Sequence, residues 1–249
     1  MVIPASKDST DAALVLPGLT DSSLASTGHF ELGALKNTSL DLFNVQGLVG
    51  TSILNVVSQS VDPAGCPNWP RGRLATSVPG GWKFGLEKGR AAGMRLRSIE
   101  GMQGEDSTRL ISEVLNIATH LTGGSTAFNG IPFFVRKAYQ LETPALGLIV
   151  AEIVRKINEE ANPREEHLLL LAERNSGERD FHLAFHVRSA GAEESLETSD
   201  VLAALTLIKT GRPAVAITFD YEDGGKIGLL ERISEGEWKL VWKSAYSGC

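Results

Sequence analysis

Apolar and polar positions alternate with two different periods along this chain of 249 residues. Apolar residues that recur at spacings of three and four predict amphipathic helices. Three stretches have this spacing: residues 105–123, 143–162 and 198–211. The pattern is clearest in 143–162, where Thr143 is an N-cap and Pro163 follows the end. The sequence therefore predicts about three helices.

Polar residues add detail to these helices. In the first stretch, Asp106 or Ser107 caps the start and Gly123 terminates the end. In the second stretch, the charged residues fall at i, i+4 spacing, which is typical of a solvated helix face. These pairs are Glu152–Lys156 and Arg155–Glu159.

Strict alternation of apolar and polar residues predicts strands in much of the remaining chain. A hairpin is expected over residues 82–87 and 94–96, and a single strand over 131–141. A second hairpin is expected over 167–174 and 180–188. Three strands near the C-terminus form an antiparallel meander with one buried face: residues 215–221, 227–233 and 238–242.

Helices and strands together predict an α+β fold, with antiparallel sheets and about three helices on one face. Residues 82–140 and 166–221 have the same strand–strand–helix–strand order, which predicts two similar halves joined by the helix at 143–162. Convergence on a common motif is the alternative to internal symmetry. The expected organisation is a loosely ordered arm (1–29), a first half (30–142) and a second half ending in the meander (143–249).

Two histidines four residues apart, His182 and His186, suggest a zinc-binding pair. On the predicted strand they are separated by roughly 13 Å at about 3.3 Å per residue. Zinc–nitrogen bonds are about 2 Å long, so the pair cannot chelate one ion. A solvated strand face is the better interpretation, and no metal site is predicted.

The overall charge limits the partners. A net charge of −6 argues against a general nucleic-acid binder, and no apolar run reaches the roughly 20 residues that span a bilayer. One segment is locally basic; its cations are Arg71, Arg73, Lys83, Lys88, Arg90, Arg95 and Arg97. These cations either pair with acids of the same chain or form a docking surface for an acidic protein, a phosphate or an anionic headgroup.

Catalytic and cofactor motifs do not stand out in the sequence. There is no GxGxxG, P-loop, HExxH or CxxC pattern, and no cofactor is expected. The run Gly123–Ala127 (GGSTA) leads from a helix into a strand, the reverse of a nucleophile elbow, and is interpreted as a helix end and turn. The run Asp220–Gly225 (DYEDGG) lacks the ligand ladder of a calcium loop and is interpreted as a hairpin turn.

These observations favour a non-catalytic binding or accessory module that contacts a macromolecular partner or a small ligand. The alternative is a hydrolase or isomerase with an acid/base cleft on the sheet, because catalytic residues often lie far apart in sequence. The first candidates for acid–base chemistry are His120, His167 and Asp220.

The only two cysteines, Cys66 and Cys249, lie outside apolar runs. Two such cysteines are typical of one disulfide in an exported protein, and two unrelated thiols in a cytosolic protein are the alternative. The first residues do not have the pattern of an intact secretory signal. The expectation is therefore a secreted or periplasmic protein whose signal was removed before residue 1, and otherwise a cytoplasmic one.

Overall fold

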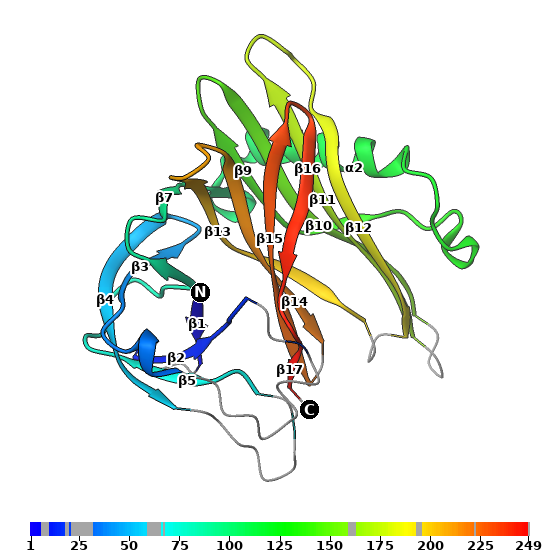
Figure 1. Ribbon diagram of the computed structural model, residues 1–249. Helices are drawn as coiled ribbons and strands as arrows, with labels where there is room; N and C mark the ends of the chain where they lie inside the picture. The colour runs from blue at the N-terminus through cyan, green and yellow to red at the C-terminus, as the bar shows by residue number, and fades with distance from the viewer. Residues whose placement is uncertain are drawn as a thin grey trace.

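The computed structural model describes residues 1–5, 10–17, 20, 32–58, 66, 68–158, 163–192, 196–221 and 223–248. In this part of the chain the architecture is mostly β, with one six-stranded barrel, two antiparallel sheets and a single α-helix (Figure 1). The predicted α+β fold with about three helices is therefore wrong. The described helical segments are α2 (Gly104–Thr119) and the short 3-10 turns η1 (Leu32–Leu35), η2 (Ile99–Gly101) and η3 (Thr126–Phe128).

The N-terminal strands form the closed barrel, in the order β1-β2-β5-β4-β3-β6. Their bounds are β1 (Val2–Pro4), β2 (Asp11–Leu14), β3 (Ser39–Asn44), β4 (Gly47–Ser58), β5 (Arg71–Leu74) and β6 (Phe84–Glu87). The first strand closes the barrel against the last, where Val2 pairs with Gly85. Leucines such as Leu42 and Leu54 fill the interior together with Trp82. Strands β1 and β2 come from the segment 1–29 that was expected to be a loose arm.

The two sheets are built from the rest of the chain. The barrel-side sheet has the order β16-β15-β14-β13-β7, and β17 pairs with β15; the helix-side sheet has the order β12-β11-β10-β9-β8. The barrel-side strands are β7 (Ala91–Met94), β13 (Thr198–Leu207), β14 (Pro213–Tyr221), β15 (Gly224–Ser234), β16 (Glu237–Lys243) and β17 (Ser247–Gly248). The helix-side strands are β8 (Arg97–Ser98), β9 (Phe134–Glu142), β10 (Leu146–Ile157), β11 (Arg164–Asn175) and β12 (His182–Ala192).

These elements pack into four layers: the barrel, the two sheets and α2. The sheets pack face to face through residues such as Leu148 and Leu169 on one side and Ile217 on the other. The barrel packs on the free face of the barrel-side sheet, and α2 packs on the free face of the helix-side sheet through Leu110 and Val114. Figure 1 shows the barrel at the lower left, the sheets in the centre and α2 at the right.

The predicted helix at 143–162 is strand β10. All nine residues from Leu146 to Val154 are buried, because one face of the strand meets the other sheet and the opposite face meets α2. A strand buried on both faces is apolar at nearly every position, so it also satisfies the helical spacing. The predicted Glu152–Lys156 pair does not form: Glu152 bonds to Arg136 and His167, and Lys156 pairs with Glu165. The other predicted pair includes Glu159, which lies outside the described residues.

The predicted helix at 198–211 is strand β13. It lies between β14 and β7, and its Leu202, Ala203 and Leu205 belong to the apolar cluster shared with the barrel. The two supposed halves therefore differ, since only the first contains a described helix. The expected boundary at 142/143 falls between paired strands, where Glu142 faces Gly147.

Several predicted elements are confirmed. These are α2, strand β9, the β11–β12 hairpin and the β14–β15–β16 meander. The helix begins after Gln103, so Asp106 lies inside the first turn and is not the cap. The first predicted hairpin is wrong, because β6 belongs to the barrel and β7 to the barrel-side sheet. Among the described residues, no helix has the length and apolar character required to cross a membrane.

Candidate functional site

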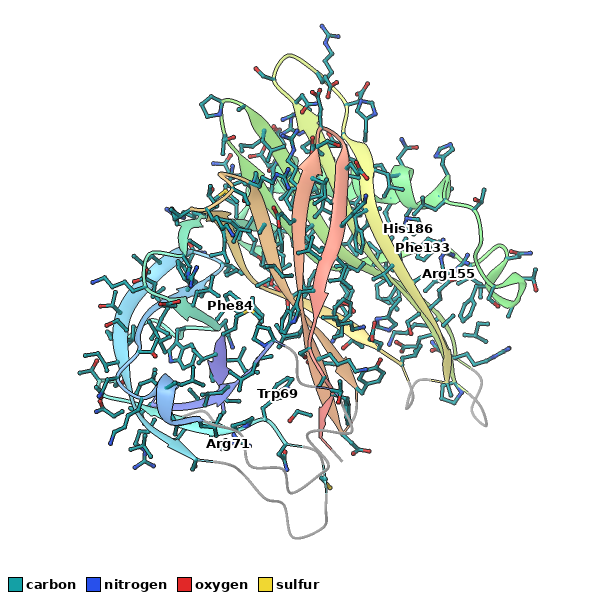
Figure 2. The ribbon with its side chains drawn as sticks, in the orientation of Figure 1. Trp69, Arg71, Phe84, Phe133, Arg155 and His186 are labelled. Atoms are coloured by element: carbon teal, nitrogen blue, oxygen red, sulfur yellow. The ribbon has the colours of Figure 1, made fainter. Side chains whose placement is uncertain are left out.

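A pocket with a volume of about 680 Å³ lies at the C-terminal end of α2. The loop between α2 and β9 forms one wall, and the helix-side sheet contributes two arginines, Arg155 and Arg188. We call this cavity the arginine pocket; its lining residues are Ala118, Thr119, Leu121, Thr122, Gly123, Gly124, Asn129, Gly130, Ile131, Pro132, Phe133, Arg155 and Arg188. Figure 2 shows Phe133 and Arg155 on the helix side of the molecule, far from Trp69 and Arg71 beside the barrel.

Three neighbouring strands bring the charges of this pocket together. Arg155 of β10 is the direct cross-strand partner of Glu166 on β11. Arg188 is on β12, the strand on the other side of β11. Both arginines donate to this one carboxylate: Arg155 through Nε to Oε2, and Arg188 through Nη1 to Oε1 at 2.8 Å. Glu166 is thus clamped between two guanidinium groups.

The three charged side chains of this cluster are largely buried, so each needs an opposite charge beside it. The side chain of Glu166 is 0% exposed, and those of Arg155 and Arg188 are 11% and 14% exposed. Burial alone disfavours ionisation of the carboxyl, but the hydrogen bonds from both arginines outweigh it and hold the pKa of Glu166 below its ordinary value. The cluster therefore carries two positive charges and one negative charge at neutral pH.

Arg155 is fixed by further contacts. Its Nη1 donates to the carbonyl oxygen of Phe128 at 2.9 Å. The guanidinium carbon lies 4.6 Å from the centre of the Phe133 ring and 5.4 Å from that of Phe128. Aromatic faces attract cations by their quadrupole, so both rings stabilise the charge while they exclude water from it.

Arg188 has an unused hydrogen-bond donor. Its Nη2 is buried, and none of the described residues accepts a hydrogen bond from it. Buried polar atoms in native proteins nearly always have a partner, and each exception calls for an explanation. Arg188 also lines the pocket, where two arginines share one carboxylate, and this excess positive charge fits an anion-binding site.

Gly124 permits this arrangement. A Cβ atom at this position would lie 2.4 Å from Nη1 of Arg188 and 2.9 Å from Nη2 of Arg155. Real Cβ atoms do not approach so closely, so any side chain at 124 would push a guanidinium aside. The loop passes directly over the paired arginines only because residue 124 has no side chain.

A second buried charge cluster contains His167, one of the sequence candidates. Its Nδ1 lies 3.0 Å from Oε1 of Glu152, and its Nε2 lies 2.6 Å from Oε2 of Glu165. Burial alone would lower the pKa of the imidazole, but the hydrogen bonds to both carboxylates outweigh it and raise the pKa. Arg136 and Lys156 complete the cluster by pairing with Glu152 and Glu165 respectively. A cavity of about 310 Å³ lies beside it.

The other two acid–base candidates lie elsewhere. His120 is exposed at the end of α2, with Nδ1 2.7 Å from the carbonyl oxygen of Asn116. Asp220 is on β14 in the other sheet, where it accepts a hydrogen bond from Thr218 at 2.7 Å. The structure therefore does not bring His120, His167 and Asp220 into one cleft.

The basic segment is divided among several elements. Arg71 and Arg73 are on β5, Lys83, Lys88 and Arg90 flank β6, and Arg95 and Arg97 lie at β8. Most of these side chains have partners in the same chain. Ion pairs join Arg73 to Asp11, Arg90 to Glu87 and Arg97 to Asp106. Hydrogen bonds join Arg71 to the carbonyl of Ala5 and Arg95 to Gln46. Three of the seven cations therefore pair with acids of the same chain, and a docking surface at this segment stays a prediction.

His182 and His186 are exposed and lie on strand β12, as predicted. A bulge opposite Leu171 and Ala172 reverses the expected alternation in this strand. Leu183 consequently packs on the α2 side, whereas Phe185 packs between the sheets.

The predicted disulfide involves Cys249, which lies outside the described residues, so the disulfide stays a prediction. Its other cysteine, Cys66, precedes a segment that contacts the C-terminal strand. The backbone N–H of Trp69 donates to Oγ of Ser247 at 3.2 Å, and its indole N–H donates to the carbonyl of Ala245 at 3.2 Å.

Sequence reasoning missed the arginine pocket. Arg155 was assigned to the solvated face of a helix, although it lies on a buried strand. Arg188 was placed on the polar face of a predicted strand without a partner. The available signal was the pair Gly123–Gly124 after α2, which marks a close backbone approach as well as a helix end.

No protein-family model, curated protein or solved structure matches this chain. Its function therefore has to be inferred from the geometry of the arginine pocket.

Proposed function

We propose that this protein is a non-catalytic binding module that binds a small anionic ligand in the arginine pocket. The observation that carries the proposal is the excess of one positive charge on the two arginines that line the pocket, since both share the one carboxylate of Glu166. An anionic oxygen in the pocket would neutralise this excess charge. Charge-assisted bonds from arginine to oxyanions are among the stronger hydrogen bonds in proteins.

The chemistry of the lining supports binding rather than catalysis. The described lining contains the hydroxyls of Thr119 and Thr122, but no histidine, cysteine, lysine or carboxylate that could activate them or act as general base. Arginine keeps its proton at neutral pH. In the other charge cluster both ring nitrogens of His167 already contact carboxylates, which leaves neither nitrogen for a substrate. A binding module is therefore favoured over a hydrolase or isomerase.

The proposal is tested with Arg188→Gln, which removes the charge but keeps a similar length. The melting temperature is measured with phenylacetate, acetate or inorganic phosphate, at constant ionic strength against chloride. At least one of these anions should raise the melting temperature of the wild type. A ligand at ten times its Kd adds about 1.4 kcal/mol to the free energy of unfolding. In Arg188→Gln the same anion should give no rise.

A matched control is Arg174→Gln. Arg174 is on β11 of the same sheet, pairs with Glu142 and lies 4.5 Å from the ring centre of Phe181, but it does not line the pocket. This variant should keep the full response to the anion. Equal responses in all three proteins, or no response in the wild type, would contradict the proposal. If Arg188→Gln does not fold, Arg188→Lys takes its place, because it keeps the charge but cannot present the same pair of donors.

We also propose an extracytoplasmic location. It depends on the predicted disulfide between Cys66 and Cys249. The contacts of Trp69 with Ala245 and Ser247 support this disulfide, because they bring the segment after Cys66 to the C-terminal strand.

A further inference from the structure

We infer that the ligand of the arginine pocket is a monoanionic carboxylic acid with an apolar body about the size of one ring. This inference rests on the proposed function and specifies the class of ligand. It follows from the charge balance, from the orientation of α2 and from the apolar side chains in the pocket lining.

The charge balance favours a single negative charge. Among the described lining residues, only Arg155 and Arg188 are charged, and both share the one carboxylate of Glu166. The cluster therefore has an excess of one positive charge, which one carboxylate neutralises. A phosphate dianion would leave a net negative charge in a largely buried site, and a buried charge without a partner is strongly unfavourable.

The orientation of α2 favours a carboxylate over a phosphate as well. Phosphate sites commonly use the N-terminus of a helix, where free N–H groups and the positive end of the dipole face the anion. Here the last turn of α2, with Ala118 and Thr119, lines the pocket. The C-terminal end of a helix carries partial negative charge, so it disfavours a second anionic charge.

Apolar side chains form part of the remaining lining. They are Leu121, Ile131, Pro132 and Phe133, and the Phe133 ring lies against the guanidinium of Arg155. Ligand pockets in proteins typically have volumes of about 300–1,000 Å³ and combine apolar side chains with polar groups that orient the ligand. The arginine pocket, at about 680 Å³, lies within this range. An inorganic anion would leave the apolar side chains uncovered, whereas a hydrocarbon body would bury them.

The test is isothermal titration of the full chain with four probes that separate charge from the apolar body. Phenylacetate carries both features, phenyl phosphate adds a second charge, benzyl alcohol has no charge, and acetate has no ring. Phenylacetate should bind at least ~10-fold more tightly than each of the others, since one charge-assisted hydrogen bond or one buried ring corresponds to that factor. Its binding should be lost in Arg188→Gln and weakened in Phe133→Leu, but not in Arg174→Gln.

The outcomes separate this inference from the proposed function. If phenyl phosphate or acetate binds as tightly as phenylacetate, and Arg188→Gln abolishes that binding, the anion site stands and the inferred ligand class is wrong. If benzyl alcohol binds as tightly as phenylacetate, or no anion depends on Arg188, both are wrong. Should Arg188→Gln fail to fold, Gly124→Ala tests the same point, because its Cβ would displace the guanidinium groups.

Discussion

At the scale of single residues, the buried carboxylates of β11 show how charge is balanced inside this fold. Glu173 is matched by one cation: Arg232 donates to both of its oxygens, and the N–H groups of Trp238 and Gly236 complete its shell. Glu166 is matched by two cations, one of which keeps an unused donor. The charges around Glu173 balance, so this site stabilises the fold. The charges around Glu166 leave one excess positive charge, so this cluster can bind one more anion.

His167 provides a residue-scale prediction about pH. Its pKa is raised in the folded state, so the folded protein binds its proton more tightly than the unfolded chain does. The stabilisation is therefore complete below the unfolded pKa of about 6.5 and is lost as the pH rises through the higher folded value. We expect the free energy of unfolding of the wild type to fall over this range, and His167→Asn to lack that part of the decrease.

Urea unfolding between pH 5 and 9 measures this effect. The control is His120→Asn, which removes an exposed histidine and should keep the wild-type profile. The carboxylates around His167 also pair with Arg136 and Lys156 in both variants. A wild-type profile that matches that of His167→Asn would refute the prediction.

At the scale of elements, the sequence predicts strands and helices well where one face is exposed. Helix α2 and the β14–β15–β16 meander have one apolar and one polar face, and both were recognised. β10 and β13 were assigned to helices because both of their faces are buried, which removes the alternation that identifies a strand. The arginine pocket depends on the register of β10 against β11, so it could not be predicted once β10 was assigned to a helix.

The β15–β16 hairpin gives a prediction at this scale. Glu173 on β11 fixes it through Arg232, Trp238 and Gly236. Glu173→Gln leaves Arg232 without its buried counter-charge, and should lower the free energy of unfolding by about 3 kcal/mol. Urea titration followed by tryptophan fluorescence measures this loss.

The control for this prediction is Glu237→Gln in the same hairpin, because Glu237 is exposed and pairs with the exposed Lys239 and with Ser234. It should shift the urea midpoint very little, since surface pairs contribute little to stability. Similar losses in the two variants would show that Glu173 does not fix the hairpin.

At the scale of the whole molecule, the C-terminal strand and the segment after Cys66 lie together although they are far apart in sequence (Figure 1). A disulfide between Cys66 and Cys249 would close a loop of most of the chain, which the chain-entropy model values at roughly 5 kcal/mol. Contacts between residues far apart in the chain, such as the pairing of Val2 with Gly85 that closes the barrel, leave no signal in the local sequence.

Thiol titration of the denatured, unreduced protein tests this bond. No reactive thiol should be detected before reduction and two should be detected afterwards, because the sequence contains two cysteines. Cys66→Ser should lower the melting temperature of the oxidised protein. Two reactive thiols without reduction would remove both the disulfide and the proposal of an extracytoplasmic location.

The order of the strands along the chain also sets an order of assembly. All barrel strands lie within residues 2–87, and the whole helix-side sheet with α2 lies within residues 97–192. In the barrel-side sheet, by contrast, β7 can pair with β13 only after β13 has been synthesised; in this pairing Ala91 faces Leu207. During synthesis, the barrel and the helix-side sheet can therefore complete their hydrogen bonding first. The layer between them is the last to form, and it joins two structures that have already folded.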